Sequence, residues 1–323
     1  MKQEITFSGK VKEELSRQWS EDRHCQIAEL TAIISLCGKV TIDSREHYSV
    51  KVRTENISVA RKYFTLLRKT FNIIAETFVT RNKCNGSVSY TVMIKNHDSA
   101  MKVLQASKLI DKDGEISEEF SMLRNLIIQN DCCKRAFIRG AFLAVGSVSN
   151  PEKSYHIEIV CAALTKAEQL RTIINGFGLE AKIIVRKKSY VVYLKEGNQI
   201  VDLLNIMKAP VSLMEMENVR ILKEMRNSVN RQVNCETANI NKTVSAAVKQ
   251  TEDIQYIREH MGLWKLPEGL KEIAELRLEY PNATLKELGD LLSTPLGKSG
   301  VNHRLRKLSE MAERLRENKE ELS

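Results

Sequence analysis

The basic side chains near the C-terminus are the residues whose types and spacing best suit contacts with an anionic partner. Residues 298–308 contain four Lys or Arg and no Asp or Glu, and acids return at Glu310. Among these cations stand Ser299, Asn302 and His303, whose polar groups can hydrogen-bond to base edges in the DNA major groove. The cations themselves suit phosphates and base edges. They are Lys298, Arg304, Arg306 and Lys307.

Three helices are predicted around this basic segment. The first begins at Pro267 and ends at Tyr280, because proline suits a first helical turn and disfavours helix in the residue before it. Thr284, with Glu287 three residues later, predicts a capping box at the start of a short second helix. The third helix contains the basic segment. A tight turn between the second and third helices is typical of a helix-turn-helix domain, here over 265–318, whose third helix would enter the major groove.

Hydrophobic spacing predicts the core of this domain. The residues predicted to pack inward are Leu285, Leu288, Leu291 and Leu292 in the second helix and Val301, Leu305 and Leu308 in the third.

The start of the second helix adds two residues, Thr284 and Lys286, to the predicted DNA contacts. The alternative to a DNA-binding domain is a three-helix protein-interaction module with an ordinary basic helix.

The positive charge of the chain is concentrated outside this domain. The net charge is +9, with 35 Lys or Arg and 26 Asp or Glu in residues 1–226 but 11 of each in residues 265–323. A basic first part predicts an anionic partner, most commonly nucleic acid, although many solvated lysines would give the same count. Since a neutral domain makes few phosphate contacts, we expect the first part to supply some of the affinity.

One predicted hairpin in the first part carries several cations. Residues 181–195 contain five Lys or Arg and no acid. Arg186, Lys187 and Lys188 are predicted phosphate contacts. A solvated hairpin with a basic turn is the alternative, because strand alternation places only some of these side chains on one face.

Two similar series of elements are predicted within residues 23–226. Each begins with a nearly all-apolar helix that ends in glycine, at Gly38 and at Gly146, and continues with alternating strands and amphipathic helices. Each series has the order αββαββα, over about 23–107 and 120–210, which indicates internal duplication. Small residues in the apolar helices favour close packing between the repeats, with the two sheets side by side as a concave surface. Helices on one face of each sheet indicate an α+β architecture.

The two apolar helices carry a family resemblance. The segments AELTAIISLCG (28–38) and RAFIRGAFLAVG (135–146) resemble a degenerate pair of LAGLIDADG motifs, the signature of the homing-endonuclease fold. Followed by a helix-turn-helix domain, they resemble the WhiA family, as does NRQVNCETAN (230–239). The resemblance implies a duplicated α+β domain followed by an all-α domain. It also implies a regulator of transcription that binds double-stranded DNA, with roles in cell division, chromosome segregation and, in some relatives, sporulation.

The acids that a LAGLIDADG nuclease needs are missing from these helices. In active enzymes the eighth motif position binds the divalent metal, and aligned on the terminal glycines it is Cys37 in one repeat and Val145 in the other. Valine ligates no metal, and a thiolate is too soft for Mg²⁺. The nearest acids, Asp43 and Glu152, follow on a strand or turn. We therefore predict no nuclease activity, metal site or cofactor, with a Mg²⁺-dependent endonuclease as the alternative.

The seven cysteines include no C-x-x-C pair, which favours reduced thiols in the cytosol over a disulfide framework. Cys25 follows His24, and we expect helix surface and core there, with zinc as the alternative. Cys132 and Cys133 are predicted to pack in the core. The sequence contains neither an apolar run that could span a membrane nor a secretory signal, so we expect a cytoplasmic, nucleoid-associated protein.

Composition also predicts how the domains are joined. Residues 1–22 form a helical extension, and residues 227–264 form a linker with a helix over about 241–261. The start of that linker is rich in Asn and Thr, which predicts a non-helical connector containing one candidate DNA contact, Arg231. We expect a monomer, because the repeat supplies its own pseudo-dimer. A scaffold whose nuclease-like platform binds another protein is a further hypothesis.

Overall fold

The computed structural model describes residues 5–82, 86–110 and 126–320. The chain divides into two compact units, Met1–Lys223 and Glu224–Ser323, and each is described by itself. We call them unit one and unit two. The predicted start of the second repeat, near residue 120, lies outside the described residues.

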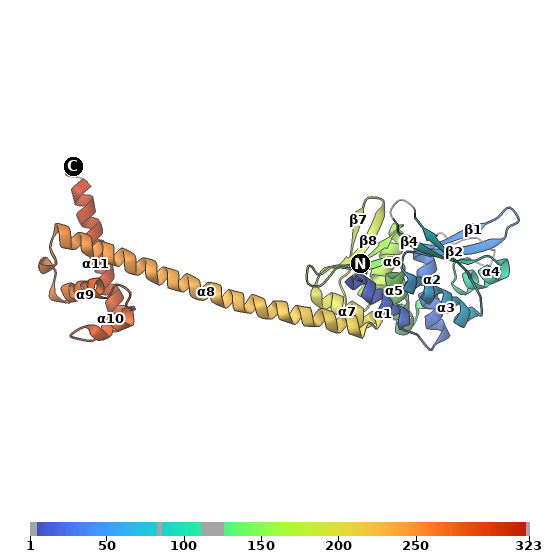
Figure 1. Ribbon diagram of the computed structural model, residues 1–323, viewed down its shortest axis with the longest axis horizontal. Coiled ribbons are helices and arrows are strands. Elements are labelled where there is room, and N and C mark those ends of the chain that lie inside the picture. The colour runs from blue at the N-terminus through green and yellow to red at the C-terminus, as the bar shows by residue number, and fades with distance from the viewer. Residues whose placement is uncertain (1–4, 83–85, 111–125, 321–323) are drawn as a thin grey trace. The chain divides into compact units, whose positions relative to one another are not determined.

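Unit one contains an N-terminal helix, α1 (Phe7–Arg17), and two repeats of the order αββαββα (Figure 1). The first repeat comprises α2 (Arg23–Cys37), β1 (Gly38–Ile42), β2 (Tyr48–Thr54), α3 (Ile57–Phe71), β3 (Glu76–Arg81), β4 (Val88–Ile94) and α4 (His97–Ala106). The second comprises α5 (Asp131–Val145), β5 (Gly146–Val148), β6 (Ile157–Cys161), α6 (Leu164–Asn175), β7 (Lys182–Arg186), β8 (Ser189–Leu194) and α7 (Gly197–Met207), preceded by the short helix η2 (Leu126–Ile128). The α+β class and the duplication are confirmed.

Each repeat forms a four-stranded antiparallel sheet, with strand orders β1-β2-β4-β3 and β5-β6-β8-β7. The strands lie on one side of unit one and most helices on the other (Figure 1). Burial alternates along β2, where Val50 and Val52 are buried and Lys51 and Arg53 are exposed. One face of each sheet therefore packs on helices, while the other stays open.

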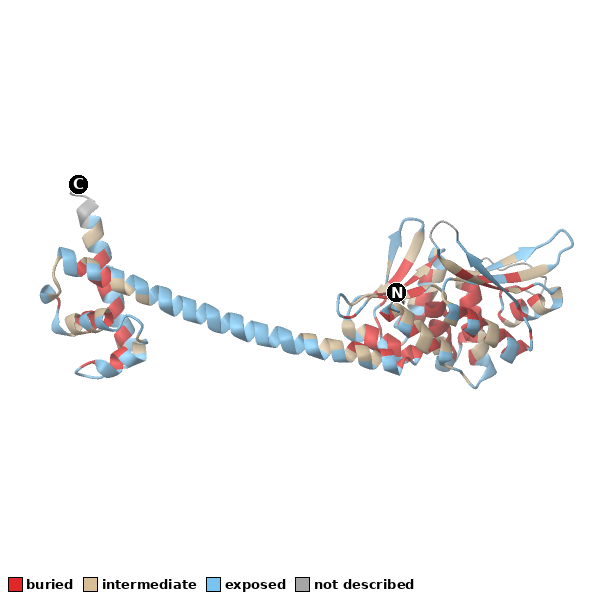
Figure 2. Cartoon of the chain, in the orientation of Figure 1, coloured by how far each residue is buried: buried red, intermediate tan, exposed pale blue. Residues whose placement is uncertain are grey.

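The helices α2 and α5 form the centre of unit one and are buried on most sides (Figure 2). Gly140 of α5 lies against α2, where a Cβ atom would overlap the carbonyl oxygen of Glu29. Glycine thus permits the close helix–helix approach that the small residues predicted. Helix α1 buries Phe7, Val11 and Leu15 in the core of the second repeat.

The prediction of a non-helical connector between residues 228 and 240 is wrong, because this stretch is helical. One helix, α8 (Pro210–His260), runs for 51 residues, and its middle is exposed (Figure 2). The stretch contains no Pro or Gly after Pro210, and Asn and Thr cost a helix only a few tenths of a kcal/mol each, roughly. Polar composition alone therefore did not end the helix.

Unit two contains the short helix η3 (Leu263–Lys265) and three helices, α9 (Glu268–Glu279), α10 (Leu285–Leu291) and α11 (Lys298–Glu320). Ile254 and Ile257 of α8 join their core. The predicted core residues Leu288, Leu292, Val301, Leu305 and Leu308 are buried, and Leu285 packs against them. Leu291 is 49% exposed, so its predicted burial is wrong. It lies at the last position of α10, where the chain leaves the helix.

The turn between α10 and α11 depends on Gly289. The backbone N–H of Leu296 donates to the carbonyl oxygen of Gly289 at 3.1 Å. A Cβ atom at Gly289 would overlap the carbonyl oxygen of Leu296. Only glycine fits here, which fixes how α11 leaves α10.

Candidate nucleic-acid interface

The first three turns of α11 present an exposed polar face. Val301, Leu305 and Leu308 point into the core and are at most 1% exposed. The residues on the other side are exposed and combine cations with hydroxyl, amide and imidazole groups. They are Lys298, Ser299, Asn302, His303, Arg306 and Lys307. The helix therefore brings six of the seven predicted contacts in this segment onto its exposed side.

Arg304 is the exception. Its Nη1 donates to the carbonyl oxygen of Gly269 in the first turn of α9 at 3.0 Å, and the residue is half-buried. The guanidinium thus ties α11 to α9 instead of joining the exposed face. Arg306 is exposed and pairs with Glu310, Nε to Oε1 3.1 Å, within the same helix. An exposed pair of this kind exchanges readily for another anion.

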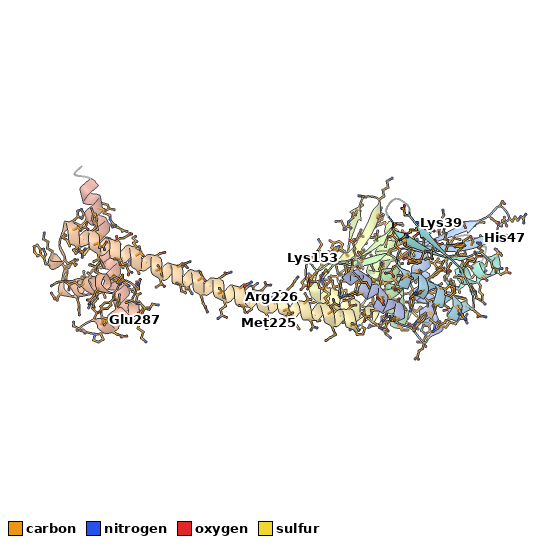
Figure 3. The ribbon with its side chains drawn as sticks, in the orientation of Figure 1. Lys39, His47, Lys153, Met225, Arg226 and Glu287 are labelled. Carbon is orange, nitrogen blue, oxygen red and sulfur yellow. The ribbon has the colours of Figure 1, made fainter. Side chains whose placement is uncertain are left out.

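The start of α10 carries the predicted capping box. Thr284 Oγ1 accepts from the Glu287 backbone N–H at 3.3 Å, and Glu287 Oε2 accepts from the Thr284 N–H at 2.7 Å. The backbone hydrogen bond from Thr284 lowers the pKa of Glu287. Lys286 stays exposed beside them. Figure 3 shows Glu287 on this short helix.

A hollow of about 850 Å³ adjoins the start of α11. It is lined by residues 242–252 of α8, the turn between α9 and α10, and the α11 residues Lys298, Ser299 and Asn302. Lys242 therefore lies near the candidate interface, which sequence reasoning missed because Lys242 is far from Lys298 in the sequence. Arg231 is exposed on α8, roughly 16 Å before Lys242 along the helix.

Arg277 forms a wall of this hollow and is 2% exposed. Its Nη1 donates to the carbonyl oxygen of Ala283 at 2.7 Å. Burial lowers the pKa of this guanidinium, and the hydrogen bond fixes the turn that leads into α10. We therefore assign Arg277 a positioning role.

The degenerate nuclease positions meet at the C-terminal ends of α2 and α5. Cys37 and Val145 line a hollow of about 570 Å³ together with Lys12, Arg53 and Glu55. Burial raises the pKa of Cys37 to about 11, and burial lowers the pKa of Lys12. The motif positions themselves bring no carboxylate here.

The two nearest acids predicted from the sequence lie elsewhere. Asp43 is exposed and accepts backbone N–H groups of Arg45 at 2.8 Å and His47 at 2.9 Å in the turn after β1. Glu152 is exposed in the turn after β5. The acid that does line the hollow, Glu55, was missed because it lies after β2, away from the motif.

The cations of the basic hairpin differ in their surroundings: one is paired with an acid, and two lie in an exposed turn. Arg186 Nη2 lies 3.1 Å from Glu158 Oε2 on the open face of the second sheet. Lys187 and Lys188 form the exposed turn, with Lys187 at φ 56°. On the first sheet, Lys39 of β1 (Figure 3) pairs in register with Lys51 of β2, and both are exposed. Strand alternation could have placed each lysine on the open face, but it could not have placed the two opposite each other.

These features define a class of protein: a duplicated LAGLIDADG-like α+β domain with a C-terminal helix-turn-helix domain. Family models match each part. Residues 23–110 match the WhiA N-terminal LAGLIDADG-like domain, residues 134–226 the WhiA LAGLIDADG-like domain, and residues 229–312 the WhiA C-terminal HTH domain. The chain belongs to the WhiA family.

Similar proteins agree with this assignment. A protein of Lachnoclostridium phytofermentans named "Probable cell division protein WhiA" is 55% identical over 97% of this chain and 100% of its own length. One of the same name from Alkaliphilus oremlandii is 50% identical over 98% and 99%. The crystal structure of full-length DUF199/WhiA from Thermatoga maritima has a TM-score of 0.57 and 26% identity, covering 96% of this chain and 98% of that one. Among the described helices, none combines the length and apolar character that a membrane span requires.

Proposed function

We propose that this chain is a regulator that binds double-stranded DNA through α11 and contributes to cell division. The observation that carries the proposal is the exposed face of α11, where Ser299, Asn302, His303 and Arg306 follow one another at helical spacing. These are side chains that hydrogen-bond to base edges and phosphates. The helix-turn-helix match and the names of the relatives support it.

The test compares two variants of the full chain that change different parts of α11. Asn302→Ala/Arg306→Ala removes two groups of the candidate face, whereas Arg314→Ala removes an exposed cation two turns further on. Binding is measured by fluorescence anisotropy at fixed salt, with a duplex enriched from genomic DNA by the protein and with a scrambled duplex. We expect the double variant to lose roughly 10-fold or more on the enriched duplex and Arg314→Ala to bind as the unchanged protein does. Equal affinities would refute the assignment.

The nuclease-like platform is proposed to be inactive in DNA cleavage. Cys37 and Val145 replace the paired carboxylates, and Glu55 is the one acid among the residues that line the hollow between them. A single carboxylate beside Lys12 and Arg53 does not provide the paired hard-oxygen set that Mg²⁺ catalysis requires. Nicking of supercoiled plasmid with Mg²⁺ or Mn²⁺, abolished by Glu55→Ala or Asp43→Ala, would contradict this proposal.

We further propose that the open sheet faces add non-specific affinity for DNA, since Lys39, Lys51 and Lys188 are exposed cations there or at the hairpin turn.

The finer expectations follow the family resemblance: a cytoplasmic, nucleoid-associated monomer with a part in chromosome segregation and, in some relatives, sporulation. If the platform instead binds a protein, replacing Lys39, Lys51 and Lys188 by Ala would leave DNA binding by the full chain unchanged. Imaging a fluorescent fusion together with stained nucleoids tests the location.

A further inference from the structure

Four side chains with metal-binding atoms meet at the N-terminal ends of α2 and α5. His24, Cys25, Cys132 and Cys133 each offer one ligand atom, and these atoms all lie within 4.8 Å of one another. His24 Nδ1 lies 3.1 Å from Cys133 Sγ and 3.3 Å from Cys25 Sγ. Three thiols and one imidazole are a set that tetrahedral structural zinc sites use. We infer that this cluster binds one Zn²⁺ ion that links the two repeats of unit one.

The internal duplication explains how the cluster arises. Cys25 and Cys133 occupy the same position relative to Gly38 and Gly146, the glycines that follow the two apolar helices. His24 and Cys132 are the residues just before them. Because α2 packs against α5, two adjacent pairs of ligands face each other across the seam. Two pairs that approach from opposite sides suit a four-coordinate ion.

The surroundings fit a structural metal with an entry path. Cys25 and Cys133 are 3% exposed and pack with Ala28 and Ala136, whereas the other two ligands are exposed. The exposed pair, His24 and Cys132, therefore provides the path from solvent to the buried thiols. His24 turns Nδ1 toward the thiols, and its Nε2 lies 3.9 Å from Asp22 Oδ2. In metal sites the second imidazole nitrogen commonly donates to a carboxylate that orients the ring, and Asp22 lies just beyond hydrogen-bond distance for that role.

A divalent ion would stabilise the thiolate form of the three cysteines directly, and their protons would be released as it binds. The N-termini of α2 and α5 further offset the negative charge of three thiolates.

A disulfide is the competing use of these cysteines. A disulfide between any two of these three cysteines would leave the third thiol unpaired and would not involve His24. It is also disfavoured in a reducing compartment. A zinc ion uses all four side chains. Its presence can be distinguished from a disulfide by the zinc content and the state of the thiols.

The experiment uses the full chain, purified under reducing conditions without chelator. We expect one zinc ion per chain by inductively coupled plasma mass spectrometry. Cys25→Ser and Cys133→Ser should reduce the bound zinc at least 10-fold, roughly, whereas Cys235→Ser changes an exposed cysteine of α8 and should retain it. Removal of the ion by a chelator should lower the melting temperature of unit one by about 5 °C or more.

Cobalt substitution tests the ligand set directly. Co²⁺ in place of zinc should show thiolate charge-transfer bands and the intense visible bands of tetrahedral coordination, both weakened in Cys133→Ser. If the buried variants fail to fold, His24→Gln and Cys132→Ser alter the exposed ligands and should weaken zinc retention in the same way. Purified chain with no zinc and no cobalt spectrum would overturn the proposal. So would a disulfide that joins two of the three clustered cysteines in protein alkylated during lysis.

Discussion

Arg139 of α5 and Glu29 of α2 form a buried ion pair across the seam between the two repeats. Arg139 Nε lies 3.1 Å from Glu29 Oε1, and Arg139 Nη2 lies 2.8 Å from Glu29 Oε2. Lys62 Nζ of α3 lies 3.4 Å from the same carboxylate, and all three side chains are at most 2% exposed. Burial lowers the pKa of Lys62. One carboxylate therefore balances two buried cations at the centre of unit one.

Glu29→Gln should destabilise unit one by about 3–5 kcal/mol, because it leaves two buried cations without a counter-charge. Urea unfolding can be followed through Trp19, which packs against Lys62 with the ammonium 3.9 Å from the ring centroid. A Trp264→Phe background leaves Trp19 as the one tryptophan. Asp131→Asn, which removes an exposed pair with Lys134, is the control and should change the midpoint little. Equal midpoints for the two variants would show that the buried pair contributes no stability.

Alanine substitutions at two glycines of unit two, Gly289 and Gly300, test the role of the turn before α11. Gly289→Ala should destabilise the helix-turn-helix domain by about 1–3 kcal/mol, because the added methyl group overlaps the Leu296 carbonyl oxygen. Gly300→Ala should stabilise it by about 0.5–1 kcal/mol, because Gly300 is helical and its nearest neighbour would be 3.6 Å away. Hydrogen exchange of peptides from α9 to α11 in the full chain measures both. Similar protection in the two variants would contradict the role of the turn.

Local signals allowed much of the fold to be predicted from sequence. Apolar helices that end at Gly38 and Gly146, strands with alternating polarity and the capping box of Thr284 and Glu287 all depend on residues a few positions apart. The duplicated order αββαββα followed from them. The continuous α8 did not, because nothing in its Asn- and Thr-rich stretch is strong enough to break a helix.

Contacts between distant residues limited the prediction of sites. Arg304 faces Gly269, and no periodicity within α11 signals that contact. His24 and Cys133 are more than a hundred residues apart in the sequence. Sequence proximity therefore showed only two of the four candidate zinc ligands, His24 and Cys25. The exposed row formed by Lys39 and Lys51 requires the strand register, which sequence alternation does not provide.

The capping box of α10 predicts a pH dependence. The backbone N–H of Thr284 lowers the pKa of Glu287 below its usual 4.5 in the folded chain. Glu287 therefore contributes stability that is fully present above pH 4.5 and is lost as pH falls through its folded pKa. The melting temperature of the full chain should exceed that of Glu287→Gln near neutral pH, and this difference should shrink as pH falls below 4.5. Asp290→Asn, an exposed acid of the same helix, is the control. A difference that does not vary with pH would contradict this assignment.

The open face of the first sheet predicts how salt affects DNA binding. Lys39 and Lys51 lie opposite each other across β1 and β2, so phosphates that reach this face would meet both ammonium groups. Each phosphate contact contributes roughly 0.9 to the slope of log affinity against log salt. Lys39→Ala/Lys51→Ala should therefore reduce the slope of the full chain on a random duplex by up to about 2.

The control for this slope removes the same charge from the helical side of the unit. Arg61→Ala/Lys102→Ala changes exposed cations of α3 and α4, which cover the opposite face of the sheet. Its slope should match that of the unchanged chain, because long-range charge alone is screened within about 8–10 Å at ordinary salt. If both double variants shift the slope equally, the effect reflects net charge and the sheet makes no direct contact. If neither shifts it, the open face of the first sheet does not contact DNA, which favours a protein partner for that face.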